Sequence, residues 1–159
     1  MRTTLNKDKV TLLSKKGMKE LKKSITQLEY DRQMLLKSLR ELDKKLGRDE
    51  RLNRIEKLSE LEGVESELDD KRSILLTSRL IPSRRTHLQV VIGSVVDLMD
   101  KHGHLFRFTL VNSVEANPSD GRISTLSPAG HSLLGRTLRD TIKWDNGKEV
   151  SRFKLVRIS

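Results

Sequence analysis

Apolar residues in the first third of the chain recur at alternating steps of three and four positions. Such steps form the a/d seam of a helix that packs against another helix, and only Arg32 interrupts the seam. Its members are Met18, Leu21, Ile25, Leu28, Leu35, Leu39, Leu42 and Leu46. Ser14 is suited to cap the start of this helix, and no Pro or Gly occurs between Gly17 and Gly47.

A second apolar series follows Gly47 and stops before Pro82, which cannot continue a helix. Its members are Ile55, Leu58, Leu61, Val64, Leu68, Leu75 and Leu80. Two seams of similar length joined by a short charged turn predict an antiparallel helical hairpin with its tip near residues 46–53. The alternative is that the seams pair between two chains as a parallel dimer. Gly47 and the charged turn favour the hairpin.

Beyond residue 82 the helical period gives way to short stretches rich in β-branched and aromatic residues. These stretches are residues 90–99, 105–111, 141–144 and 150–156. The first two meet across His102-Gly103-His104, and the last two flank Asn146-Gly147, a preferred tight-turn sequence. The pattern therefore predicts two β-hairpins in a strongly bent antiparallel sheet.

A short helix is predicted between the two β-hairpins. Ser127 can cap this helix, Pro128 fits its first position, and Gly135 can close its far end. We therefore expect an α+β protein with two parts, a helical hairpin at residues 1–81 and a sheet domain at residues 82–159.

Charge points to an anionic partner. Lys and Arg number 32 against 22 Asp and Glu, which gives a net charge of +10 that is spread over both parts. The chain has no cysteine, so disulfides, thiolate metal sites and cysteine nucleophiles are excluded. It has neither a signal peptide nor an apolar run of membrane-spanning length, so we expect a cytoplasmic protein without a membrane partner.

Four fragments carry a family resemblance through their order and spacing. They are residues 12–21, 92–96, 114–117 and 123–135. In that order they resemble the "LT-x-x-G-x-x-x-L" opening, the "GS-x-V" strand, the "EAD" turn and the "IS-x-x-SP-x-x-x-A-L-x-G" segment of the GreA/GreB family of bacterial transcript-cleavage factors. The resemblance runs over nearly the whole chain.

The resemblance implies a coiled coil followed by an FKBP-like domain that docks on RNA polymerase. The docking residues would be Leu126, Ser127, Pro128 and Gly130, and an exposed Leu126 would favour an apolar contact. The coiled coil would enter the secondary channel, where it would meet the nascent RNA 3′ end. The chain would be an accessory to the polymerase active site, not an enzyme, with no cofactor of its own and no small-molecule substrate.

The tip departs from the family pattern, in which an Asp and a Glu stand three residues apart and help hold the catalytic Mg²⁺ of the polymerase. If Gly47 matches the family glycine, Arg48 falls on that Asp. The candidate catalytic carboxylates are then Asp49 and Glu50, which are adjacent and flanked by arginines. Either they share the polymerase Mg²⁺ and support cleavage, or the hairpin occupies the channel without cleavage. The altered tip favours the second, and a solvated turn is the simpler interpretation of both acids.

Basic residues gather in the half of the hairpin near the tip. They are Lys37, Arg40, Lys44, Lys45, Arg48, Arg51 and Arg54. We expect them to hold the phosphates of extruded RNA, as a basic patch does in the family. The alternative is an ordinary mixed-charge helical surface, because Glu41, Asp43 and Glu56 interleave with them.

Two rival functions remain open at this point. The basic coiled coil could bind nucleic acid without polymerase, or the FKBP-like topology could indicate a prolyl isomerase. With only three Phe, one Tyr and one Trp, an aromatic-lined prolyl pocket is not expected. Trp144 is expected in the core, and His102 and His104 in a polar turn rather than a metal site.

Overall fold

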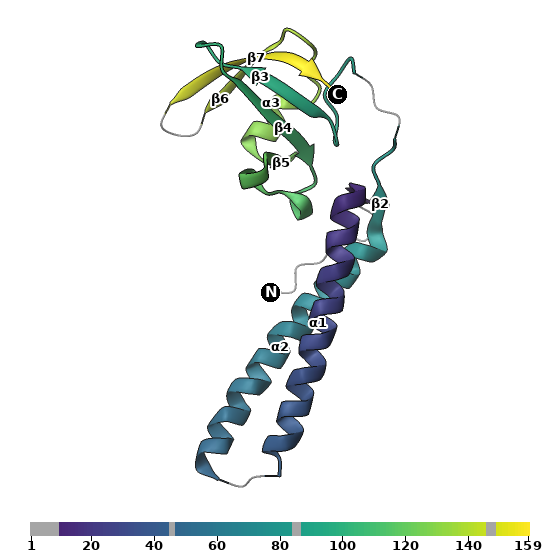
Figure 1. Ribbon diagram of the computed structural model, residues 1–159, viewed down its shortest axis with the longest axis vertical. Coiled ribbons are helices and arrows are strands. Elements are labelled where there is room, and N and C mark those ends of the chain that lie inside the picture. The colour runs from purple at the N-terminus through teal and green to yellow at the C-terminus, as the bar shows by residue number, and fades with distance from the viewer. Residues whose placement is uncertain (1–9, 45–46, 84–86, 146–148) are drawn as a thin grey trace. The chain divides into compact units, whose positions relative to one another are not determined.

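The computed structural model describes residues 10–44, 47–83, 87–145 and 149–159. These residues form two compact units (Figure 1). One unit is Met18–Ser78, and the other joins Val10–Gly17 to Arg79–Ser159. The α+β fold class is confirmed. The division into separate domains at residues 1–81 and 82–159 stays a prediction.

The first unit is an antiparallel hairpin of two long helices, α1 (Lys15–Leu42) and α2 (Arg48–Thr77), which lie side by side in Figure 1. The hairpin within one chain is therefore confirmed against the parallel dimer. Ion pairs join the helices, from Arg32 to Glu65 at 2.8 Å and from Arg72 to Glu29 at 2.7 Å. No helix among the described residues is long and apolar enough to cross a membrane.

The seam of α1 is more regular than that of α2. In α1, Leu21, Ile25, Leu35 and Leu39 are buried at the predicted spacing. In α2 only Leu68 is buried. The expectation that Ile55 and Leu58 also lie in the seam is wrong, because both side chains are exposed near the tip.

The helix boundaries also differ from the prediction. Helix α1 ends at Leu42 instead of Leu46, and residues 45–46 lie outside the described residues. Helix α2 ends at Thr77 because the chain turns extended there. Its next residues form β2 (Ser78–Leu80), which pairs with β1 (Thr11–Leu13) in a two-stranded sheet that the sequence pattern did not indicate.

Ser14 caps α1, as predicted, and also hydrogen-bonds to Glu115, which the helix pattern alone does not indicate. Its hydroxyl oxygen accepts the backbone N–H of Gly17 at 2.9 Å. Its own N–H donates to the Glu115 carboxylate at 2.8 Å, and its hydroxyl donates to the other carboxylate oxygen. A Cβ at Gly17 would overlap that carboxylate. Two motifs about a hundred residues apart in the chain therefore meet at one hydrogen-bonded site.

The second unit contains a five-stranded sheet in the order β5-β4-β3-β7-β6. The strands are β3 (Val95–Met99), β4 (Leu105–Val111), β5 (Arg122–Ser124), β6 (Thr141–Asp145) and β7 (Val150–Ile158). All neighbours are antiparallel except β4 and β5. The prediction of a purely antiparallel sheet is therefore wrong at this edge. Two 3-10 turns, η1 (Ser113–Glu115) and η2 (Pro118–Asp120), carry the chain back so that β5 runs parallel to β4.

Helix α3 (Pro128–Leu133) packs on one face of this sheet. Its Leu133 joins a buried cluster with Val96, Leu98, Leu110 and Leu155. The predicted strand at residues 90–99 begins only at Val95, because Ser94 turns the chain and its hydroxyl accepts the N–H of Val91. The predicted Asn146-Gly147 turn lies outside the described residues.

Candidate functional site

The loop that precedes α3 is built from its own serines. The Ser127 hydroxyl accepts the N–H of Gly130 at 3.1 Å and donates to the Ser124 carbonyl oxygen at 2.7 Å. The Ser124 hydroxyl in turn accepts the N–H of Leu126 at 3.1 Å. These bonds confirm the predicted cap and hold the Leu126 side chain at the surface, where it is 63% exposed.

The four residues expected to contact polymerase thus have different surroundings. Gly130 is buried, and a Cβ there would overlap the Ser124 carbonyl, so its role is close packing of α3 on β5. Ser127 is engaged in capping. Leu126 and Pro128 are the two exposed ones.

An apolar groove of 430 Å³ lies beside this loop. It is lined by Phe108, Ala116, Pro118, Ile123, Ser124, Ser127, Pro128, Ala129, Trp144 and Asp145. Phe108 and Trp144 meet edge to face there, with their ring centroids 5.6 Å apart. Trp144 packs against the buried cluster, which confirms its expected core position, but its ring also forms part of the groove wall.

The aromatic residues are few, yet all three Phe and the Trp gather on one face of the sheet. Phe153 lies 5.7 Å from Trp144 and 5.8 Å from Phe106, measured between ring centroids. Two of these rings, Phe108 and Trp144, line the groove, while the expectation that no prolyl pocket forms stays a prediction. Cross-strand register collects these side chains, since Phe108 faces Val96 on β3 and Phe153 faces Ile142 on β6, and both partners belong to the core.

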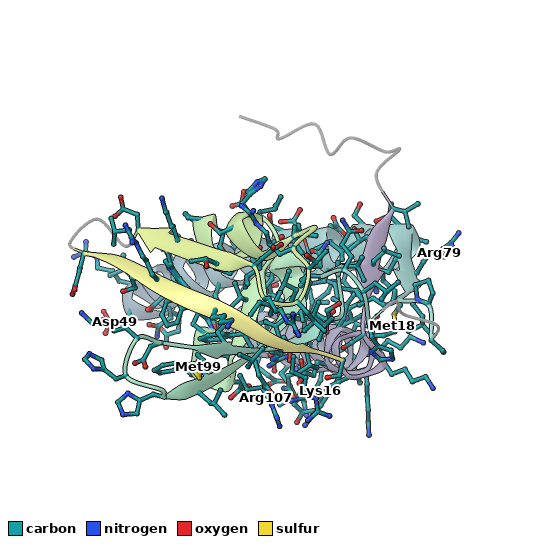
Figure 2. The ribbon with its side chains drawn as sticks, turned by 90° about the horizontal axis from the view of Figure 1, so that it is seen from above. Lys16, Met18, Asp49, Arg79, Met99 and Arg107 are labelled. Carbon is teal, nitrogen blue, oxygen red and sulfur yellow. The ribbon has the colours of Figure 1, made fainter. Side chains whose placement is uncertain are left out.

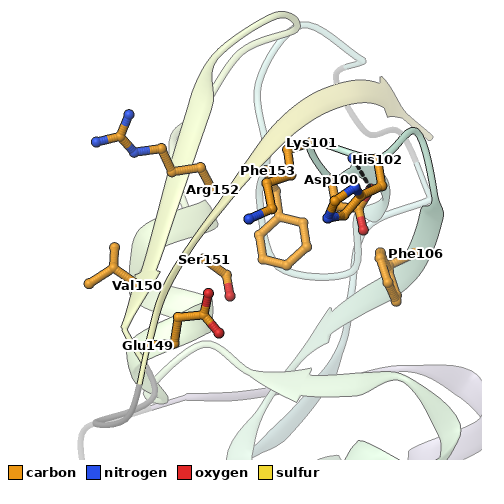
Figure 3. A pocket seen from close by; sticks show the side chains of 9 residues that line it. All are labelled: Asp100, Lys101, His102, Phe106, Glu149, Val150, Ser151, Arg152 and Phe153. Atoms are coloured by element: carbon orange, nitrogen blue, oxygen red, sulfur yellow. Dashed lines mark hydrogen bonds between the residues drawn. The ribbon is translucent and has the colours of Figure 1, made fainter.

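Phe108, Trp144, Phe153 and Phe106 thus form an aromatic row. A second hollow, of 690 Å³, lies at the Phe153 and Phe106 end of this row (Figure 3). It is lined by Asp100, Lys101, His102, Phe106, Glu149, Val150, Ser151, Arg152 and Phe153. The polar turn expected here is confirmed, because Asp100 accepts the N–H groups of His102 and His104 and contacts the His104 ring at 3.1 Å. Partial burial acts to raise the pKa of Asp100, but these hydrogen bonds outweigh it and the pKa is lowered.

The two candidate carboxylates are neighbours at the hairpin tip. Asp49 and Glu50 lie in the first turn of α2, where neighbouring residues point about 100° apart. Asp49 is exposed, whereas the Glu50 carboxylate lies against the Cα of Gly47. Both charges suit a helix N-terminus. A pair that shares a metal ion needs oxygens aimed at one point, and a shared Mg²⁺ at Asp49 and Glu50 stays a prediction.

The basic residues of the hairpin divide into paired and unpaired ones. Arg54 bridges to Asp43 at 2.9 Å, and Lys44 contacts Glu41 at 3.4 Å. Lys45 lies outside the described residues. Four predicted phosphate ligands are exposed and make no ion pair with any described residue, namely Lys37, Arg40, Arg48 and Arg51.

The comparisons with known proteins point in one direction. A family model described as "Transcription elongation factor, GreA/GreB, C-term" matches residues 85–159. The protein named transcription elongation factor GreA of Clostridioides difficile is 32% identical over 97 residues, which cover 60% of this chain and 61% of that protein. The GreA of Mycoplasma pneumoniae is 27% identical over 150 residues, covering 92% of this chain and 94% of that one.

Among solved structures, the transcription factor Gfh1 is similar over 94% of this chain and 97% of its own, with 26% identity and a TM-score of 0.46. Gfh1 of Thermus thermophilus is similar over 95% of this chain and 99% of its own, with 25% identity and a TM-score of 0.43. The match to the C. difficile relative spans about three fifths of that protein's length.

Proposed function

We propose that this chain is a GreA/GreB-type transcription elongation factor, since residues 85–159 match that family model. In this proposal it binds RNA polymerase and places its helical hairpin in the secondary channel without promoting RNA cleavage. The second unit is the docking module in this proposal, and the hairpin is the part that enters the channel. The tip geometry carries the choice of occupancy over cleavage.

Exposure around α3 supports docking through the second unit. Leu126 projects from a loop held by three hydrogen bonds and lies next to an apolar groove that contains Pro128. A rigid apolar projection beside a groove lined by Phe108 and Trp144 can bury a helix or loop of a partner at small entropic cost. The docking residues are then Leu126 and Pro128, with Ser127 and Gly130 shaping the loop.

The hairpin tip supports a role without metal delivery. Asp49 and Glu50 are adjacent in the first turn of α2, and Arg48 and Arg51 bring positive charge to the same turn. Cations in the same turn as the carboxylates oppose the approach of a divalent ion. The same arginines, together with Lys37 and Arg40, suit the phosphates of RNA that lies in the channel.

The test uses stalled, backtracked elongation complexes with end-labelled RNA. We expect no Mg²⁺-dependent shortening of the RNA on addition of the wild-type chain. We also expect the chain to slow cleavage by an active cleavage factor in proportion to its concentration. The Asp49→Ala/Glu50→Ala variant should compete as well as wild type, because the carboxylates are not needed for occupancy.

Two outcomes would change the proposal. RNA shortening by wild type that disappears in the double variant would assign cleavage to Asp49 and Glu50. No competition and no binding to polymerase would contradict the proposal as a whole.

A further inference from the structure

The face of the five-stranded sheet opposite α3 collects cations from three strands. We call it the basic sheet face and define it by Arg107, Lys143, Arg152, Lys154 and Arg157. Register places them together, since Lys143 lies opposite Arg152, and Asp97 lies opposite both Arg107 and Arg157. All five cations are exposed. Arg107 and Met99 of this face are labelled in Figure 2.

A bulge in β7 increases the charge of this face. Leu155 pairs with Leu98 and Arg157 pairs with Asp97, so Val156 is an extra residue in the ladder. Without it, strict alternation would turn Arg157 to the face opposite that of Lys154. With it, Lys154 and Arg157 both point outward while Leu155 and Ile158 both enter the core.

Acidic residues neutralise the basic sheet face only in part. Asp97 is held by Arg107 through two hydrogen bonds, of 2.8 Å and 3.1 Å. Asp145 is the last residue of β6 and lies on the same face, two residues from Lys143. Lys143, Arg152, Lys154 and Arg157 make no ion pair with any residue that the structure describes. Like charges directly opposite on a sheet are destabilising, so the Lys143 and Arg152 pair favours folding less than a neutral pair would.

The composition of this face fits a nucleic acid backbone better than a protein partner. Protein interfaces are enriched in Arg but depleted of charge at their centre and of Lys, whereas nucleic acid interfaces are polar and strongly positive throughout. The aromatic rings lie on the other face, and in Figure 3 Arg152 points away from Phe153 and Phe106. Among the residues that the structure describes, this face carries no aromatic ring for base stacking, and contact with phosphates is what it offers.

We infer that the basic sheet face binds the phosphodiester backbone of nucleic acid without sequence preference, independently of the hairpin. Four unpaired cations that each neutralise one phosphate of duplex DNA would give a slope of about −3.6 for the logarithm of the binding constant against the logarithm of salt concentration. The site is separate from the groove beside α3 and from the hairpin tip.

The test measures binding of the full chain to a labelled DNA duplex over a range of salt, and repeats it with single-stranded RNA. The variant is Lys143→Gln/Arg152→Gln/Lys154→Gln. We expect its dissociation constant to rise at least about tenfold at low salt and its salt slope to become shallower by about 2.7, equally for unrelated sequences. The duplex and single-strand arms show which source of phosphate the face prefers.

The matched control is Lys19→Gln/Lys22→Gln/Lys23→Gln, which removes the same charge from exposed positions of α1. We expect a smaller loss of affinity from the control than from the sheet variant. Thermal unfolding of the sheet variant should stay at or above the wild-type temperature, since like-charge repulsion is relieved. Equal effects of the two triple variants would overturn the inference. So would binding to anionic vesicles or polyglutamate as tight as binding to DNA.

Discussion

At the scale of single residues, the most informative contact joins Ser14 to Glu115. Sequence alone indicated the Ser14 cap and, separately, the fragment that contains Glu115, but no pattern linked the two. The link depends on a carboxylate that is 5% exposed and accepts both donors of Ser14. A buried carboxylate of this kind is stabilising only while its donors remain.

Removal of the Glu115 carboxylate should therefore destabilise the fold. We expect Glu115→Ala to lower the free energy of unfolding by about 2 kcal/mol, because charge-assisted hydrogen bonds contribute more than neutral ones. Glu115→Gln should cost less, since the amide keeps one acceptor. Chemical denaturation measures both. Glu62→Ala, at an exposed position of α2, should change stability little and serves as the control.

Two glycines in helices should respond oppositely to alanine. Alanine favours a helix by about 1 kcal/mol over glycine, and Gly63 has nothing within 4 Å of the added Cβ, so Gly63→Ala should stabilise by up to that amount. At Gly17 the Cβ would meet the Glu115 carboxylate, and the lost hydrogen bonds should outweigh the helix preference. We expect Gly17→Ala to be destabilising in the same denaturation assay. Stabilisation at both sites would contradict the Gly17–Glu115 packing.

The Asp97–Arg107 pair predicts a pH effect with a definite sign. The hydrogen bond from Arg107 lowers the pKa of Asp97 below its ordinary value of 3.8, with smaller contributions from the charges of Arg107 and Arg157. Because the pKa of Asp97 is lower in the folded than in the unfolded protein, its ionised form stabilises the fold at pH values above 3.8. This contribution is lost as the pH falls through the folded-state pKa of Asp97. Arg107→Gln should raise the Asp97 pKa in an NMR titration. Its stability deficit should be present near neutral pH and shrink in acid.

At the scale of elements, the hairpin seam is uneven, and substitutions should reveal this. Leu68 is 2% exposed, so Leu68→Ala should lower the free energy of unfolding by about 3 kcal/mol. Ile55 is 65% exposed although it has the same predicted spacing, and Ile55→Ala should cost less than about 0.5 kcal/mol. Urea denaturation of the two variants makes the comparison. A large loss of unfolding free energy in Ile55→Ala would mean that the part of α2 near the tip is packed in solution.

The elements also show which parts of the fold a sequence pattern can predict. Strand β4 was predicted at the bounds observed, because its β-branched and aromatic residues end at clear turns. The capped α3 was predicted for the same local reason. Strand β5 and the β1–β2 pair were missed because they have three residues each and depend on distant partners. The seam of α2 was overestimated because spacing does not say how close the opposite helix lies near the tip.

The candidate sites follow the same division. Ser127 and Pro128 could be placed from their capping pattern, and their neighbours confirm that placement. The aromatic row was missed because its members come from β4, β6 and β7 and meet only through register. The basic sheet face was missed for a related reason, since the bulge at Val156 reverses the alternation on which a strand prediction relies.

At the scale of the whole molecule, the proposed docking of the second unit rests on Leu126, and one substitution separates it from folding. Leu126 makes its loop hydrogen bond through its backbone N–H, so Leu126→Asn should leave stability nearly unchanged. Burial of a leucine side chain contributes about 1.5–3 kcal/mol, so the same variant should weaken binding to core RNA polymerase about tenfold or more. Leu138→Asn, another exposed leucine of the same unit, is the matched control and should bind as wild type.

Ser127→Ala completes this comparison, because Ser127 shapes the loop without offering an apolar contact. It should lower stability by about 1 kcal/mol through loss of the cap, and it should also weaken polymerase binding, since Leu126 is then held less firmly. A variant that loses polymerase binding at constant stability identifies a residue that contacts the polymerase. A variant that loses both binding and stability identifies a residue that holds the loop in place. If Leu126→Asn and Leu138→Asn weaken binding equally, the exposed leucines act only through general hydrophobicity, and the loop before α3 is not the docking surface.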